Sequence, residues 1–310
     1  MKKKRKVTVS EINHCYQRTV DRGVLFYNIR DHLVFFTVFC TMAVRYDIRV
    51  VKLVQMPDHV HHSSMTASAY RLSCFQRDYT SIFAREYNSA FGLHGPVFDS
   101  PFGSAPKHGN KVMRTNMLYL DNNPVERKLV ARAELYQWNY MAYAQSENPF
   151  SDSIRLRYAS LQLRRAIKYV KALHDSGQYI IYRVMTKLFD SLPSIQEKDQ
   201  LADYIVNTYS VIDYSFSIGL FGSFENEILA AASNTGSEYD IQESFLGKDD
   251  RWYARFSSII MNHGIVKDIH DILRMGNDKK EKLFQLLRRE TSAPTVQIAA
   301  YLHLPVIIKR

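Results

Sequence analysis

The most constraining stretch of this 310-residue chain is a pair of short segments joined by a tight turn. Residues 48–55 (IRVVKLVQ) are rich in β-branched side chains, Met56-Pro57-Asp58 interrupts them, and residues 59–64 (HVHHSS) follow directly. β-Branched residues favour strands, and Pro next to Asp favours a turn. The sequence therefore predicts two neighbouring strands joined as a hairpin, and the fold must include a sheet that holds them.

The patterns around this hairpin favour an α+β domain. The further elements expected in this half are a strand within 9–25, an apolar helix over 31–45 begun by an Asp cap, a helix over 66–89, a long irregular loop over 91–110 rich in Gly, Pro, Ser and His, and a helix over 111–120 that stops near Asn123-Pro124. This order suits helices packed on an antiparallel sheet.

Helical patterns dominate the rest of the chain. The expected helices are 156–172, 179–189, 198–205, 223–232, 251–261, 279–290 and 295–303. Asn148-Pro149 marks a break between the two compositions. We therefore predict a basic arm over 1–8, a domain over 9–148 and a helical domain over 149–310.

Charge and cysteine content narrow the class of protein. The formal net charge is +10, which favours an acidic partner such as nucleic acid or, less often, an anionic membrane surface. The apolar stretch 32–44 is too short to span a bilayer, and no apolar signal segment follows the basic start. Three scattered cysteines without a CxxC pair argue against thiolate zinc and for a reducing compartment. We expect a soluble, cytoplasmic protein that does not contact a membrane.

The basic run Lys2-Lys3-Lys4-Arg5-Lys6 has three readings. It resembles a nuclear import signal, and an expression tag would look the same. We favour a flexible arm that binds phosphates, because short basic runs at chain ends are usually solvated.

Met56-Pro57-Asp58-His59-Val60-His61 carries the sharpest chemical signal. On a strand, His59 and His61 project from one face, where two imidazoles can share a metal ion, while His62 points the other way. The competing interpretation is a chance cluster of surface histidines, so this motif needs a second element.

The second element is the run 116–125 (NMLYLDNNPV). On a helix, Tyr119 and Asn123 are one turn apart and share a face, so a tyrosine nucleophile and an amide oxygen could meet the same metal-bound phosphate. The alternative is that Tyr119 is a half-buried core aromatic, as many of the 20 tyrosines must be.

Together the two runs resemble the single-tyrosine HUH transposases, and within them the REP-associated tyrosine transposases. The likeness covers residues 9–145, and three further matches accompany the two runs: Tyr16-Gln17-Arg18-Thr19, Phe102-Gly103-Ser104 and Tyr136-Gln137-Trp138. The resemblance implies a ferredoxin-like (RRM-like) sheet, His59 and His61 as metal ligands, Tyr119 as nucleophile and Asn123 as third ligand. Some family members carry Gln at the third position, and Asp58 fills a variable position to which no role is assigned.

The implied reaction is cleavage and rejoining of single-stranded DNA. A tyrosine hydroxyl has a pKa near 10 and needs help at neutral pH, which Mg²⁺ or Mn²⁺ on the phosphate would give. Attack by Tyr119 leaves a 5′-phosphotyrosine and a 3′-hydroxyl, so rejoining needs no ATP. The expected partner is single-stranded or hairpin DNA of a mobile element, in a bacterial cell near the nucleoid. The sequence is compatible with a monomer and with a homodimer.

The basic residues nearest these motifs are candidates for phosphate contacts, although solvated surface charge explains each of them equally well. They are Arg18, Arg22, Lys107, Lys111 and Arg114.

Residues 286–304 resemble the start of a helix-turn-helix, but only 305–310 follow the turn, fewer than groove reading requires. A packed helical hairpin is the competing interpretation.

Two other classes of function remain open. One is a DNA-binding protein that has lost cleavage, such as a domesticated transposase or repressor, and the other is a basic RNA-binding protein. The intact set of His59, His61 and Tyr119 argues against the first.

Overall fold

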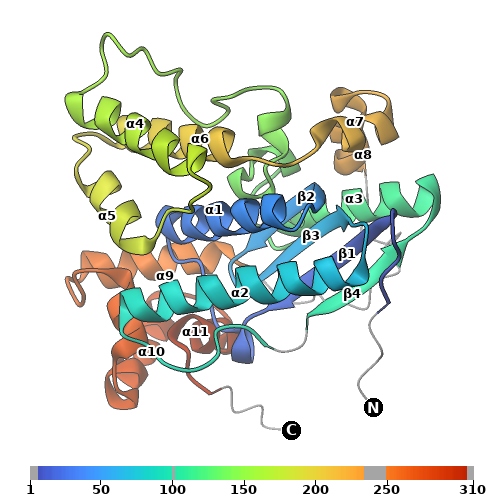
Figure 1. Ribbon diagram of the computed structural model, residues 1–310. Helices are drawn as coiled ribbons and strands as arrows, with labels where there is room; N and C mark the ends of the chain where they lie inside the picture. The colour runs from blue at the N-terminus through green and yellow to red at the C-terminus, as the bar shows by residue number, and fades with distance from the viewer. Residues whose placement is uncertain (1–5, 100–101, 234–248, 306–310) are drawn as a thin grey trace, which may run out of the picture.

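A four-stranded antiparallel sheet lies at the centre of the protein in the computed structural model, which describes residues 6–99, 102–233 and 249–305 (Figure 1). Its strands are β1 (Ile12–Arg18), β2 (Arg49–Met56), β3 (His59–Met65) and β4 (Gly103–Lys107). Their order across the sheet is β2-β3-β1-β4, and every neighbouring pair is antiparallel.

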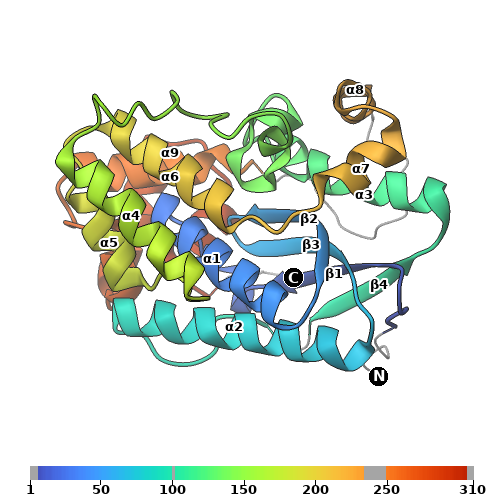
Figure 2. The ribbon, with the colours of Figure 1, turned by 45° about the horizontal axis from the view of Figure 1, so that its top comes forward.

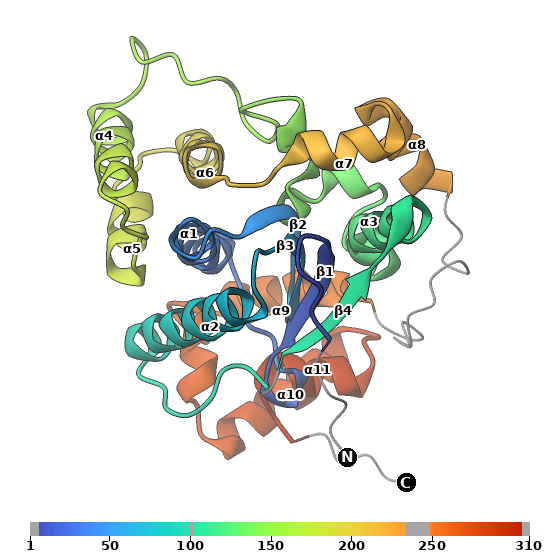
Figure 3. The same ribbon diagram turned by 45° about the vertical axis from the view of Figure 1, so that its right-hand side comes forward.

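Two helices make the crossovers of this sheet. Helix α1 (Ile29–Arg45) joins β1 to β2, and α2 (Ala69–Phe91) joins β3 to β4. Both cover the same face of the sheet, as Figure 3 shows. The strand order with two helical crossovers is the split βαβ arrangement. The predicted ferredoxin-like α+β fold followed by helices is confirmed.

Helix α1 begins two residues before the predicted start. The side chain of Asn28 caps it by accepting from the amide of Arg30, and Asp31 completes a capping box in the first turn. The expectation that Asp31 itself is the N-cap was therefore wrong, because Asn28 is the N-cap. Asp31 sits at the third helical position, where a carboxylate bonds the amide of the capping residue.

The other face of the sheet carries α3 (Gly109–Glu126), α7 (Tyr214–Phe221) and α8 (Phe224–Ser233). A buried ion cluster fixes this layer: the ammonium of Lys52 on β2 lies 2.7 Å from Asp121 on α3 and 2.8 Å from Glu227 on α8. Burial raises the pKa of Asp121 to about 7; Lys52 opposes the shift and Glu227 adds to it. The cluster joins residues on both sides of the predicted boundary.

Two local predictions in this layer were wrong. The expected loop over 91–110 contains strand β4, which is an edge strand; Pro106 is tolerated there because an edge need not use every amide. The helix expected to stop near Asn123-Pro124 runs on to Glu126 with Pro124 inside it. Pro124 removes one backbone hydrogen bond close to the end, which shortens the helix less than a central Pro would.

All seven predicted C-terminal helices are present with shifted ends, α8 and six others. The others are α4 (Leu161–Asp175), α5 (Tyr182–Asp190), α6 (Ile195–Tyr209), α9 (Arg251–Asn262), α10 (Asn277–Glu290) and α11 (Thr295–Leu302). Helix α4 begins at Leu161 rather than 156, because Ser160 caps it by accepting from the amide of Leu163. Helix α7 was not predicted. Short 3₁₀ turns complete the fold: η1 (Val20–Arg22), η2 (Ala133–Leu135), η3 (Gln137–Asn139), η4 (Met141–Ala144) and η5 (Ile269–Arg274).

Helices α4 and α6 lie along the outer side of α1, so that α1 is buried between them and the sheet (Figure 2). One apolar cluster accordingly runs from Cys15 in β1 to Ile212 beyond α6. A second cluster is formed by α9, α10 and α11 around Phe256 and Leu287, and it includes Val24 from the segment between η1 and α1. Apolar packing therefore continues across residue 148.

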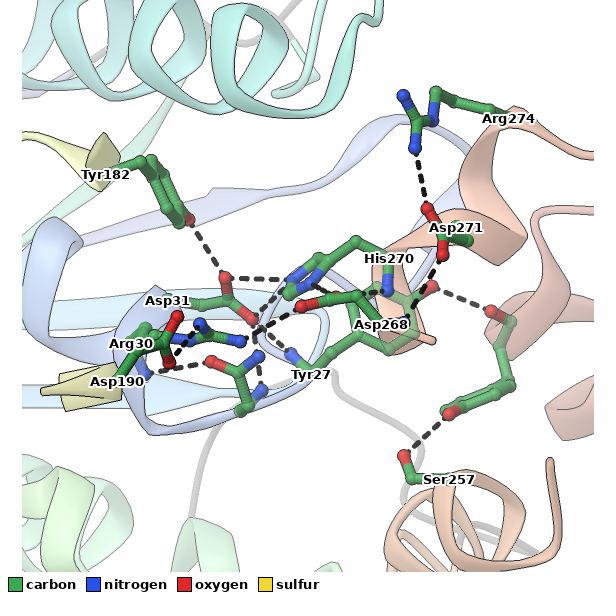
Figure 4. A network of polar contacts seen from close by, with 12 residues as sticks. Tyr27, Arg30, Asp31, Tyr182, Asp190, Ser257, Asp268, His270, Asp271 and Arg274 are labelled. Carbon is green, nitrogen blue, oxygen red and sulfur yellow. Dashed lines mark hydrogen bonds and ion pairs between the residues drawn. The ribbon is translucent and has the colours of Figure 1, made fainter. Parts of the chain in front are cut away.

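A polar network fastens the C-terminal region to the start of α1 (Figure 4). His270 in η5 bonds both oxygens of Asp31 at 3.0 Å through Nε2 and bonds Asp268 at 2.7 Å through Nδ1. Tyr182 donates to Asp31 at 3.0 Å. The two carboxylates, which outweigh the effect of burial, raise the pKa of His270 to about 9, so the imidazole is charged at neutral pH.

Within the described residues, no helix is both long and apolar enough to cross a membrane. The hairpin of α10 and α11 matches the two helices expected there. The recognition helix of the suggested helix-turn-helix would fall mainly on 306–310, and most of the basic arm on 1–5; both lie outside the described residues.

Candidate active site

Strand β3 presents two histidines to α3. The Cα of His61 lies opposite Tyr16 of β1, and that of His59 opposite Arg18, so these four residues share one face of the sheet. The imidazole rings of His59 and His61 are 4.8 Å apart between centroids. His62 points to the other face, as predicted, where it bonds Gln76 of α2.

Helix α3 runs along β3 in the opposite direction, and successive contacts follow that course. Ser63 donates to Asn116 at 2.6 Å, and one turn later the ring of Tyr119 lies 5.5 Å from that of His61. Two turns beyond Tyr119, Arg127 donates to Asp58 at 3.1 Å. The intermediate turn carries Asn123, which this progression brings level with His59. His59, His61 and Tyr119 thus lie together between one strand and one helix, and Asn123 lies on the same helix.

Three of these side chains hold buried polar atoms with no hydrogen-bond partner among the described residues. They are Nε2 of His59, Nε2 of His61, and both side-chain polar atoms of Asn123. An unsatisfied buried polar group destabilises a fold by about 1–3 kcal/mol, so a ligand that bonded these atoms would stabilise the site. Two imidazole nitrogens and one amide oxygen fit Mg²⁺ or Mn²⁺ with coordination positions left for other oxygens. Within the described ranges, no group of three or more His, Cys, Asp or Glu side chains is placed to hold a metal ion.

The far nitrogens of both rings are bonded in a way that sets their orientation. Nδ1 of His59 lies 2.6 Å from a carboxylate oxygen of Asp58, and Nδ1 of His61 lies 3.0 Å from Nε2 of His14. The carboxylate of Asp58 holds the proton on Nδ1 of His59, which leaves the lone pair of Nε2 facing the other way. The bond to His14 is consistent with the same tautomer for His61.

Electrostatics favour the neutral form of His61. Burial, followed by the neighbouring His59, His14 and Arg18, holds its pKa well below the ordinary value for histidine. A neutral imidazole is the form that binds a metal ion. The same positive neighbourhood suits a phosphate.

Sequence reasoning missed two contributors to the site. Asp58 was given no role, and His14 was not singled out, yet each bonds one of the two histidines. The alternation of side chains along β1 could have revealed His14, because it shares a face with Tyr16. Nothing local marks Asp58, since its contacts depend on the turn between β2 and β3.

Tyr119 lies against the histidines but is only 1% exposed. Its ring is 5.8 Å from that of His14 and edge-on to His61. A second tyrosine is close by: the ring of Tyr16 is 6.2 Å from that of His61 and 36% exposed. It lies over Gly103, where an added Cβ would collide with the ring. A phosphodiester can reach Tyr119 only after covering groups move.

The candidate phosphate-binding residues are not brought together in one place. Arg18 lies at the site, half-buried, with its guanidinium 5.4 Å from the ring centre of Tyr16. Arg22 is exposed in η1, beyond the same end of β1. Lys107 pairs in register with Ile12 at the opposite end, where Lys111 and Arg114 are exposed on the first turns of α3. Apart from Arg18, these basic residues lie beyond the two ends of the histidine pair.

Comparisons with known proteins give one structural likeness. No family model matches the chain, and no curated protein matches it either. A solved structure, described as the REP-associated tyrosine transposase bound to a REP hairpin, is similar over 47% of this chain and 86% of its own. The identity is 14% and the TM-score 0.40.

Proposed function

We propose that the protein is a metal-dependent tyrosine endonuclease and strand transferase of the transposase type, acting on single-stranded or hairpin DNA. One observation carries this proposal. The Nε2 atoms of His59 and His61 are buried beside the ring of Tyr119, and neither has a hydrogen-bond partner among the residues that the structure describes. Most buried polar atoms in proteins are hydrogen-bonded, so two such nitrogens beside each other and beside a tyrosine support a ligand at this point.

In this proposal, the oxygen of Tyr119 attacks the phosphorus of one phosphodiester. The bond from phosphorus to the 3′-oxygen breaks, the tyrosine proton is lost, and the departing oxygen takes up a proton to become a 3′-hydroxyl. No oxidation state changes, and the phosphotyrosine keeps the bond energy for rejoining. A divalent cation held by His59, His61 and Asn123 would withdraw charge from the phosphate oxygens.

The charge distribution supports a nucleic-acid substrate. The chain carries a formal net charge of +10, and Arg18 lies on the same face of the sheet as the two histidines. Arg22 lies beyond one end of the site, and Lys111 and Arg114 beyond the other, so a strand passing along α3 would meet positive charge before and after the scissile phosphate.

Cleavage of an end-labelled single-stranded hairpin tests the proposal. With Mn²⁺ or Mg²⁺ present we expect cut product together with a covalent protein–DNA band on a denaturing gel. EDTA should remove both, and added Mn²⁺ should restore them. Undiminished cleavage in EDTA would contradict the metal assignment, whereas binding without any cleavage would leave a DNA-binding protein.

That second candidate has one observation in its favour. Tyr119 and Asn123 are almost completely buried, which suits a site that has ceased to admit DNA. A protein of this kind would bind the hairpin with the same salt dependence, since that depends on phosphate contacts, and would form no adduct under any metal condition.

A further inference from the structure

We infer that Asp250, from the helical region, is a positioning residue for the metal-binding histidine His59. The inference rests on the proposed function, because it concerns how the metal ligands of that site are held. Asp250 directly precedes α9, and it reaches His59 through two intermediate side chains, Arg127 and Asp58.

Each link in this chain is short and buried. Nδ1 of His59 lies 2.6 Å from Oδ1 of Asp58, and the same oxygen accepts from Nη2 of Arg127 at 3.1 Å. The Nε of Arg127 then donates to Asp250 at 2.7 Å. Asp58, Arg127 and Asp250 are 5%, 2% and 0% exposed. At this depth solvent screens the pairs weakly, so the position of one charge affects the next.

The geometry of Arg127 explains why the distant carboxylate matters to His59. A guanidinium between two carboxylates divides its donors, and here Nε serves Asp250 while Nη2 serves Asp58. Without a charge at 250, Arg127 would be free to form a bidentate pair with Asp58, which is the preferred geometry for one carboxylate. Arg127 would then compete with His59 for the oxygens of Asp58, and the imidazole would lose its fixed tautomer and orientation.

Asp250 is itself held from two directions. Its backbone amide donates to the carbonyl of Arg127 at 2.9 Å, and its other carboxylate oxygen accepts from Gln297 of α11 at 3.3 Å. The helical hairpin near the C-terminus is thereby connected to the catalytic face of the sheet. The helical region would thus set the geometry of the metal site as well as packing against it.

Mn²⁺ affinity of the full-length protein measures this role without any need for DNA. Free Mn²⁺ can be counted by electron paramagnetic resonance during titration of the wild-type chain, Asp58→Asn and Asp250→Asn. We expect Asp58→Asn to weaken binding roughly 10- to 100-fold and Asp250→Asn roughly tenfold, the range typical of groups that orient metal ligands. Asp250→Glu, which keeps the charge, should recover part of the loss, and it replaces Asp250→Asn in the comparison if the latter does not fold.

Asp203→Asn is the matched control. Asp203 is equally buried and accepts from Tyr143 and Ser151, neither of which belongs to the site. We expect it to lower the melting temperature while changing Mn²⁺ affinity by less than about twofold. An equal loss in Asp203→Asn and Asp250→Asn would mean general loosening and would overturn the inference.

The double variant decides whether Asp250 acts through Asp58. If it does, adding Asp250→Asn to Asp58→Asn should weaken Mn²⁺ binding no further, within about twofold. Fully additive losses, or unchanged affinity in Asp250→Asn, would overturn the inference and leave the proposed function intact. Failure of the wild-type chain to bind Mn²⁺ would instead overturn the proposed function, on which the inference rests.

Discussion

The two faces of β3 hold histidines in opposite chemical situations. His62 faces α2, where its nitrogens are bonded to Ser64 and Gln76 and its ring packs against Phe39. His59 and His61 face α3, and each is bonded through Nδ1 only, leaving Nε2 unpartnered within the described ranges. All three are nearly inaccessible to solvent, so burial alone does not distinguish a structural histidine from a ligand.

The difference lies in which hydrogen-bonding groups surround each ring. On the α2 face the amide of Gln76 supplies a partner for the second nitrogen of His62. On the α3 face the ring of Tyr119 lies beside His61, and helix geometry places Asn123 near His59. The side-chain amide atoms of Asn123 are themselves unpartnered in the part of the chain that the structure describes. A site that binds a cation must leave donors for it, and that requirement costs stability until the cation arrives.

The most severe change is truncation near residue 148, which removes the C-terminal helices that pack on α1. We expect a fragment ending near residue 148 to lose cooperative folding, because α1 would then expose the apolar surface that packs on α5 and α6, and Arg127 would lose Asp250. A circular dichroism melt measures this. A sharp transition with retained cleavage would support the division of the chain at residue 148 predicted from composition.

Replacing single histidines compares the two faces directly. His59→Ala or His61→Ala should each abolish metal-dependent cleavage while the protein stays folded, because the two remaining ligands bind a hard cation poorly. His62→Ala, the matched control, should lower the free energy of unfolding by about 1–3 kcal/mol but leave cleavage per folded molecule intact. Cleavage assays beside urea melts measure both effects. Loss of activity only in His62→Ala would reverse the assignment of the faces.

Acid should destabilise the α1–α2 face through its neutral histidines. Burial lowers the pKa of His62 to about 3 and that of His32 to about 4. Both therefore contribute stability above the unfolded value near 6.5, and that stability is lost as the pH falls toward the folded values. Each should add a slope of up to about 1.4 kcal/mol per pH unit between about pH 6 and 4.

Urea melts at several pH values measure this slope. His62→Gln should make it shallower, whereas His174→Gln, which changes an exposed histidine, should leave it unaltered. An identical slope in wild type and His62→Gln would contradict the assignment.

Alkali should act on the C-terminal attachment with the opposite sign. The pKa of His270 is raised to about 9, so its ion pairs with Asp31 and Asp268 stabilise the fold fully below pH 6.5. This contribution, about 3 kcal/mol at most, is lost as the pH rises through about 9. Melts of wild type and His270→Gln should converge above that pH, and a constant difference between them would refute this origin.

What the sequence could predict was local. The hairpin, the shared face of His59 and His61 and the one-turn spacing of Tyr119 and Asn123 follow from the periods of strand and helix, and the structure contains them. Strand β4 was missed because Gly-Ser-Ala-Pro-Lys lacks β-branched side chains and only its place at an edge makes it a strand. The bond between Arg127 and Asp250 joins positions 123 residues apart, and no local pattern encodes such a pair.

The decisive measurement for the proposed function is the identity of the nucleophile. Wild-type protein should be incubated with a single-stranded hairpin and Mn²⁺, denatured, digested, and the DNA-bearing peptide identified by mass spectrometry. We expect one adduct, on Tyr119. Tyr119→Phe should lose the adduct and keep DNA binding within about twofold, because the ring that packs on His61 is retained. Tyr16→Phe, the control for the more exposed neighbouring tyrosine, should still form the adduct. An adduct on Tyr16, or none on wild-type protein that binds both DNA and Mn²⁺, would contradict the account.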